Sequence, residues 1–112
     1  MNRSPEWSQG LLGKARDDQF VLMQLAGNPQ SPTWALGFHA QQAVEKAIKA
    51  VLSSRSVDFP YTHDLERLME LLAGSGAPVP PDAARLPELT PFGVTLRYHE
   101  DAQPALDQLD RQ

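Results

Sequence analysis

The chain has 112 residues, enough for one domain that buries about 65% of its unfolded surface and supports a modest core. Ten Lys and Arg against fourteen Asp and Glu give a net charge of −4, which disfavours broad electrostatic binding of nucleic acid but leaves room for a local basic patch. With no cysteine, disulfides, thiolate nucleophiles and thiolate metal sites are excluded, and the three scattered His residues predict no zinc site.

The first predicted helix has Ser4 as its N-cap and Pro5 at its first position, and it ends near residues 27–29. The residues before it lead into no apolar run, so we expect no signal peptide, no transmembrane segment and a cytoplasmic location. The apolar residues of this helix share one face: Trp7, Leu11, Ala15, Leu22 and Leu25. Asp18 falls on the same face, where a carboxylate must reach solvent, find a cation or raise its pKa. We favour a structural ion pair or a tilted helix over a functional carboxylate there.

The second predicted helix starts at residues 31–33, runs to about Ser53 and contains neither Gly nor Pro from Phe38 onward. Its apolar residues recur at three- and four-residue steps: Leu36, Ala40, Val44, Ala47, Ile48 and Val51. A second stripe is polar and consists of His39, Gln42, Lys46 and Lys49. Because small apolar residues permit close packing, we expect this helix at the centre of a bundle. Leucine at Ala43 or Ala47 should then overpack the core, whereas Gln41→Leu should do much less.

A third helix is predicted to open at Tyr61 or Thr62 and to stop at residues 74–76. Its apolar stripe is best explained by core packing and consists of Leu65, Leu68, Met69 and Leu72. Residues 77–91 hold five of the ten prolines, which predicts a loop or a short helix. Apolar residues resume over residues 89–98, and a last short helix is predicted over residues 104–110.

Residues 41–52 read Gln-Gln-Ala-Val-Glu-Lys-Ala-Ile-Lys-Ala-Val-Leu and strongly resemble the signature helix of the HEPN family (higher eukaryote and prokaryote nucleotide-binding domains). His63-Asp64-Leu65 and Arg97-Tyr98 follow in the order that this family uses, so the resemblance spans roughly residues 7–98. It implies a helix over the region of Arg97-Tyr98. Together with the periodicity it predicts an all-α, up-and-down bundle of four to five helices. We expect a single HEPN-like domain over residues 1–112, with a last helix that is short or truncated.

An antiparallel bundle can bring polar residues of different helices into one cleft. If the resemblance holds, the candidates for nucleotide binding are Asp18, Glu45, Lys46, Lys49, His63, Arg97 and Tyr98. An alternative of at least equal weight is that Lys46 and Arg97 neutralise the two carboxylates and fix the helix register. For His63, too, a structural role is favoured, namely that of a helix-capping residue.

The ribonuclease members of the family are known by an Arg, four to six intervening residues, and then a His. That chemistry needs a cation for the scissile phosphate and a base for the ribose hydroxyl. No Arg here has a His at that spacing: His63 is one residue too far from Arg55, and His99 is only two residues after Arg97. His99 also stands where related members usually have Pro. We therefore lean against an enzyme and keep His63, Arg97 and His99 only as weak catalytic candidates.

Three functions remain open at this point. The first is a nucleotide- or RNA-related binding module that partners a minimal nucleotidyltransferase, as half of a toxin–antitoxin pair. The second is a non-standard, metal-independent RNA endonuclease, and the third is a structural dimerisation module without a ligand. The missing Arg-to-His spacing and the acidic net charge favour the first over the second. We also expect no cofactor, no metal and no membrane contact. We expect a homodimer formed through apolar surface that the short last helix leaves uncovered.

Overall fold

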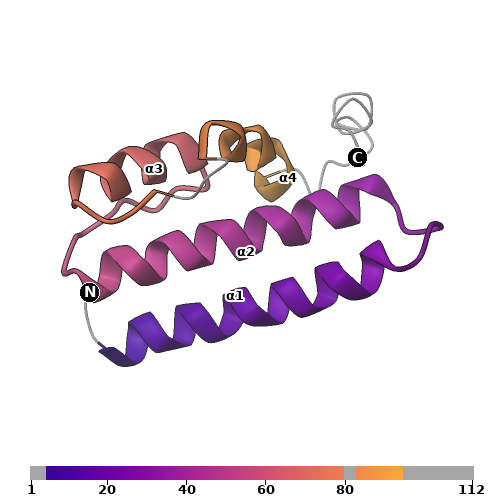
Figure 1. Cartoon of the computed structure of the whole chain (residues 1–112), viewed down its shortest axis with the longest axis horizontal. Helices are drawn as coiled ribbons and strands as arrows, with labels where there is room; N and C mark the ends of the chain where they lie inside the picture. Colours follow the sequence, from indigo (N-terminus) through magenta and orange to yellow (C-terminus); the bar gives the residue numbers. More distant parts are fainter. Residues whose placement is uncertain (1–4, 80–82, 95–112) are drawn as a thin grey trace.

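A computed structural model describes residues 5–79 and 83–94. Its helices are α1 (Pro5–Ala26), α2 (Thr33–Ser54), α3 (Leu65–Gly74), the 3-10 helix η1 (Ala83–Leu89) and α4 (Thr90–Val94) (Figure 1). No strand occurs within these ranges, so the prediction of an all-α helical bundle is confirmed. None of the helices in the described ranges has the length and apolar character that a bilayer span requires.

The helices form layers around α2. Helix α1 packs along one side of α2, and α3, η1 and α4 lie along the opposite side (Figure 1). The prediction that the second helix lies at the centre of the bundle is therefore confirmed.

The turn between α1 and α2 is held by side-chain hydrogen bonds. The Ser31 hydroxyl donates to the Leu25 carbonyl oxygen at 2.7 Å, and the Asn28 side chain accepts from the Gln30 amide at 2.9 Å. The first bond satisfies one of the carbonyl groups that the end of α1 leaves without a helical partner. Pro32 itself has an extended backbone and is the N-cap residue that precedes α2.

The start of α3 lies later than predicted. Asp64 is the N-cap, and its carboxylate accepts from the Glu66 amide at 3.0 Å, so α3 begins at Leu65 and not at Tyr61 or Thr62. The Thr90 hydroxyl accepts from the Leu65 amide at 3.1 Å and occupies another free donor of this helix start. Pro60 and the following residues remain non-helical.

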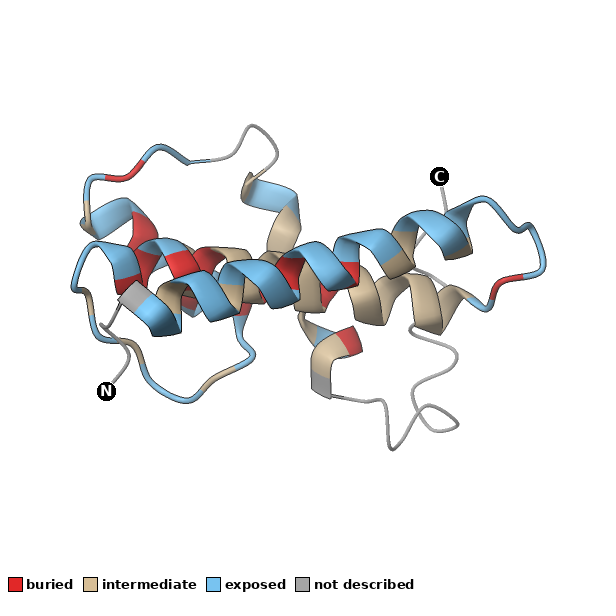
Figure 2. Ribbon diagram, turned by 90° about the horizontal axis from the view of Figure 1, so that it is seen from below, coloured by how far each residue is buried: buried red, intermediate tan, exposed pale blue. Residues whose placement is uncertain are grey.

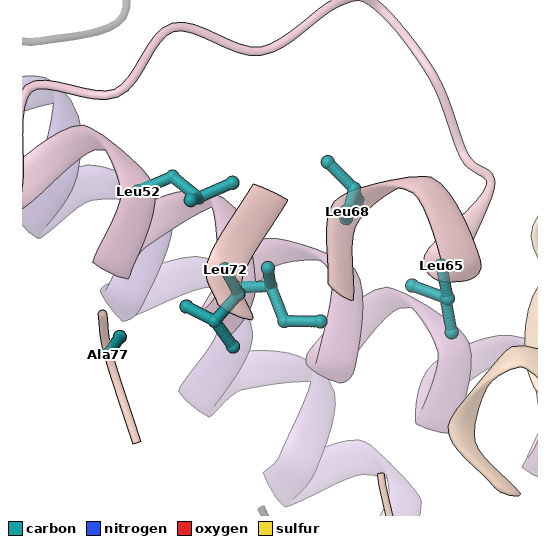
Figure 3. Close-up of a cluster of buried hydrophobic side chains, with 6 residues drawn as sticks. Leu52, Leu65, Leu68, Leu72 and Ala77 are labelled. Atoms are coloured by element: carbon teal, nitrogen blue, oxygen red, sulfur yellow. The ribbon is translucent and has the colours of Figure 1, made fainter. Parts of the chain in front are cut away.

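The apolar core lies between the second half of α2 and α3. Leu52, Leu65 and Leu68 are fully buried, and Leu72 and Ala77 pack beside them (Figure 3). The predicted use of the third helix's apolar stripe for core packing is confirmed for these leucines.

The buried side of α2 differs from the predicted apolar stripe. The residues that α2 buries are Gln41, Glu45, Ile48, Ala50, Leu52 and Ser53. Val51 is 39% exposed, whereas Gln41 is fully buried. The expectation that Gln41→Leu does much less damage than leucine at Ala43 or Ala47 assumed an exposed Gln41, and the structure removes that assumption. The reason for the difference is that α2 is covered from two opposite sides, and a single stripe cannot describe both contacts.

Helix α4 packs on α2 through two glycines. The buried ring of Phe92 lies where a Cβ of Gly37 would stand, and the Gln41 side chain lies where a Cβ of Gly93 would stand. By propensity, Gly93 makes residues 89–98 a poor helix. The packing explains the glycine, because a side chain at this position would overlap Gln41. Residues 95–98 of that predicted helix and the predicted last helix lie outside the described residues.

Candidate functional site

A buried carboxylate on α2 is the centre of one polar cluster. Glu45 is 4% exposed, and its Oε2 accepts from the Lys49 ammonium at 2.8 Å. Its Oε1 accepts from the Gln41 amide at 2.7 Å and lies 2.9 Å from Nδ1 of His63. Gln41 is in turn held by Gln42, whose amide donates to Gln41 Oε1 at 2.6 Å. Both oxygens of Glu45 are thus used within the protein, and the cluster fixes His63 to the middle of α2.

Burial of Glu45 by itself would raise its pKa, but the hydrogen bonds from Lys49, Gln41 and His63 outweigh burial and lower the pKa below the ordinary value of 4.5. Glu45 is therefore ionised at neutral pH and can only accept hydrogen bonds. Nδ1 of His63 must then donate to Glu45, which leaves Nε2 for other partners. Because the His63 side chain is 53% exposed, that nitrogen is the part of the cluster available to a ligand.

The lowered pKa of Glu45 predicts a loss of stability in acid. A depressed carboxyl pKa stabilises the folded state above the ordinary value of 4.5, and this contribution disappears as the pH falls through the folded pKa. We expect Glu45→Gln to flatten the dependence of Tm on pH between about pH 5 and pH 2, the interval in which a paired carboxylate becomes protonated. Thermal unfolding followed by circular dichroism across this range measures the slope. An unchanged slope in Glu45→Gln would contradict the assignment of the acid sensitivity to this carboxylate.

A second polar cluster joins α1 to α2. Asp18 Oδ2 accepts from the Lys46 ammonium at 2.7 Å, and Asp18 Oδ1 lies 3.0 Å from Nδ1 of His39. The Asp18 side chain is 12% exposed, and those of Lys46 and His39 are about a quarter exposed. The structure contains the ion pair that was one of the two structural explanations expected for Asp18, with Lys46 as its cation.

Among the described residues, no hydrogen bond or ion pair joins the two clusters. Asp18 belongs to α1, and His63 lies just before α3, on the opposite side of the central helix (Figure 1). The expectation of a single cleft stays a prediction. The cation on Glu45 is Lys49, four residues further along the same helix, a spacing that is worth about 0.3 kcal/mol when such a pair is exposed. In the structure both of its side chains are largely buried.

The remaining site candidates, Arg97, Tyr98 and His99, lie outside the described residues. Within residues 5–79 and 83–94, no group of three His, Asp or Glu side chains is arranged to hold a metal ion.

Gln41 is the site residue that the sequence reasoning missed. It donates to Glu45 at 2.7 Å and lies 3.4 Å from the His63 carbonyl oxygen, so it belongs to the centre of the first cluster. Its spacing of four residues from Glu45 was an available signal, because residues four apart face each other on a helix. His39 was recognised only as part of a polar stripe, and its contact with Asp18 depends on the packing of two helices.

The family model of the HEPN domain matches residues 31–111. The match covers α2, the His63 region and the positions of Arg97, Tyr98 and His99, whereas Asp18 precedes it. Comparison with curated proteins gives no match, and comparison with solved structures gives none either.

Proposed function

Since the chain belongs to the HEPN domain family, we propose that it binds a nucleotide or a short RNA as the partner of a small, separately encoded nucleotidyltransferase. In this proposal the two proteins form a cytoplasmic toxin–antitoxin pair. Family membership supports a nucleotide- or RNA-related module in general terms. The partnership and the toxin–antitoxin role are further steps that need their own tests.

The observation that carries the proposal is the state of His63. Its ring is held by a buried, ionised carboxylate through Nδ1, while the His63 side chain is 53% exposed. An imidazole fixed in this way can accept a hydrogen bond when neutral and donate one when protonated. It can therefore contact a ribose hydroxyl, a base edge or a phosphate oxygen.

Binding is favoured over cleavage because the two cations of the polar clusters are already engaged. Lys46 is paired with Asp18 at 2.7 Å and Lys49 with Glu45 at 2.8 Å. A scissile phosphate would need a positive charge that these pairs do not leave free. Arg97 is the remaining candidate of the family motif, and it belongs to the proposed binding surface.

We also propose that the module is a homodimer. Phe20 and Met23 of α1 are 65% and 66% exposed, on a helix that presents a largely exposed surface on the side away from α2 (Figure 2). Large exposed apolar side chains on one helix are typical of a surface that another protein covers. Sedimentation at micromolar concentration tests the dimer, and a monomer throughout that range would contradict it.

Titration of fluorescently labelled single-stranded RNA and of ATP into the purified protein tests ligand binding. We expect weak binding by the parent and binding about tenfold weaker or more in His63→Gln, the loss expected for one hydrogen bond to a charged group. His39→Gln is the matched control, because His39 also contacts a carboxylate but belongs to the other cluster. Lys46 is unsuited to this test, since its removal would leave Asp18 without its cation.

Equal affinity in the parent and in His63→Gln would remove His63 from the site, and no binding of either ligand would contradict the proposed function. Cleavage of RNA without metal that disappears in His63→Ala would favour the endonuclease. The partnership is tested separately, by whether a nucleotidyltransferase encoded beside this chain co-purifies with it.

A further inference from the structure

The segment that connects α2 to α3 is held against α2 at both of its ends (Figure 1). Near its start, the side chains of Val57 and Phe59 pack against the apolar core, and the Lys49 ammonium lies 5.7 Å from the centre of the Phe59 ring. Near its end, Nδ1 of His63 lies 2.9 Å from Oε1 of Glu45. The middle of the segment is therefore fixed from both directions.

Tyr61 lies between these two anchors and is 101% exposed, so no part of the described chain covers its ring. It follows Pro60, whose backbone is restricted by the proline ring. On its other side, the Thr62 hydroxyl accepts from the Asp64 amide at 3.0 Å, which restricts the connection to His63. An aromatic ring on such a fixed segment loses little conformational freedom when a flat ligand stacks on it. The ring has no part in the core and is available to a ligand.

Tyr61 and His63 are close enough to contact one small ligand. Since they are two residues apart, their Cα atoms are separated by no more than about 7 Å. Nδ1 of His63 donates to Glu45, so Nε2 of the neutral ring is an acceptor. A ribose hydroxyl can donate to this nitrogen, whereas an unprotonated phosphate oxygen cannot. The two residues thus offer a flat aromatic surface and a hydrogen-bond acceptor, which match a base and its ribose.

The charges around His63 also disfavour a phosphate group. Asp64 follows it directly, and the Asp64 carboxylate accepts from the amide of Glu66, a further exposed acidic residue. The cation of the cluster, Lys49, is bound to Glu45 at 2.8 Å. Because carboxylates repel a phosphate, a ligand held beside His63 is recognised by its uncharged parts.

We propose that this site holds the nucleoside part of its ligand, with the base stacked on Tyr61 and a ribose hydroxyl donating to His63. This inference rests on the proposed function and deepens it, since it names the part of the ligand that is recognised. Stacking on an aromatic ring accepts any base, because every base has a flat π face. A free nucleotide and an unpaired base of single-stranded RNA can therefore both occupy the site.

Titration with adenosine, followed by proton NMR, tests the stacking. We expect Tyr61→Leu to bind adenosine about tenfold more weakly than the parent, a loss within the range found for one base–aromatic contact. Tyr61→Phe is the matched control, because it keeps the ring and should retain the affinity. The base protons of adenosine should shift upfield on binding to the parent and to Tyr61→Phe, but not to Tyr61→Leu. Tm should be equal in all three proteins, since the Tyr61 side chain is exposed.

Two further comparisons separate the parts of the ligand. Dideoxyadenosine, which lacks both hydroxyls of the sugar ring, should bind the parent several-fold more weakly than adenosine, and this difference should disappear in His63→Ala. Tyr61→Leu should lower the affinities for adenosine, ATP and single-stranded oligoadenylate by a similar factor. An abasic oligonucleotide of the same length, which offers phosphates without bases, should not bind.

Equal adenosine affinity in the parent and in Tyr61→Leu would overturn the inference, and so would an abasic oligonucleotide that binds as tightly as oligoadenylate. If ATP or RNA nevertheless bound the parent and lost affinity in His63→Gln, the proposed function would stand without Tyr61. No binding of adenosine, ATP or RNA to the parent would overturn both.

Discussion

Replacing Glu45 with alanine is expected to lower the free energy of unfolding by about 3–5 kcal/mol, the range found when one partner of a buried ion pair is removed. The Lys49 side chain is 12% exposed and would keep its charge in a largely buried place without the carboxylate. Gln41, which is fully buried, would lose the acceptor of its amide. Urea unfolding at pH 7 measures the change.

Glu88→Ala is the matched control for this substitution. Glu88 pairs with Arg85 at 3.6 Å, and both side chains are at least half exposed, so the loss should stay below about 0.5 kcal/mol. If the two variants unfolded at the same urea concentration, Glu45 would not hold the centre of the bundle together.

The order and the bounds of the first two helices could be predicted from the sequence because Pro and Gly mark them. Pro5 starts α1, which ends at Ala26 just before Gly27, and α2 runs from Thr33 to Ser54 after Pro32. The start of α3 was predicted too early, because Thr62 and Asp64 are both good N-caps. Each accepts a hydrogen bond from the amide two residues later, but helical residues follow only Asp64.

The buried polar side of α2 could not be predicted from periodicity. A pattern of apolar residues locates a buried face only where that face is apolar, and here Gln41 and Glu45 occupy it. Their contacts come from parts of the chain further along: Gly93 packs against Gln41, and His63 contacts Glu45 from 18 residues away. Such a contact is a property of the folded bundle, and the sequence alone shows only two polar residues on a helix.

The candidate site was predicted in its parts but not in its arrangement. The Asp18–Lys46 pair is one of the outcomes that the sequence allows for a carboxylate on an apolar helix face. Whether Asp18 and Glu45 share a cleft depends instead on which side of α2 each neighbouring helix packs. That choice is made by contacts such as the close approach of Phe92 to Gly37, which no local pattern indicates.

Gly37→Ala is expected to destabilise the fold by up to about 3 kcal/mol, the upper range for overpacking a tight contact. The added methyl group would overlap the ring of Phe92, which is only 3% exposed and cannot swing freely into solvent. Alanine normally stabilises a helix relative to glycine, so the destabilisation must come from the contact with α4. Hydrogen exchange of residues 90–94 should accelerate together with the loss of stability measured by urea unfolding.

Gly10→Ala provides a control of opposite sign. A Cβ at Gly10 meets no atom within 4 Å, so this substitution in α1 should stabilise the protein by about 0.5–1 kcal/mol. In a Phe92→Ala background the ring is absent, and Gly37→Ala should then cost nothing and become slightly stabilising. If Gly37→Ala raised the stability of the parent as Gly10→Ala does, α4 could not pack on α2 through these two residues. Its departure would also expose Gln41, whose side chain Gly93 covers, and so weaken the cluster that holds His63 in place.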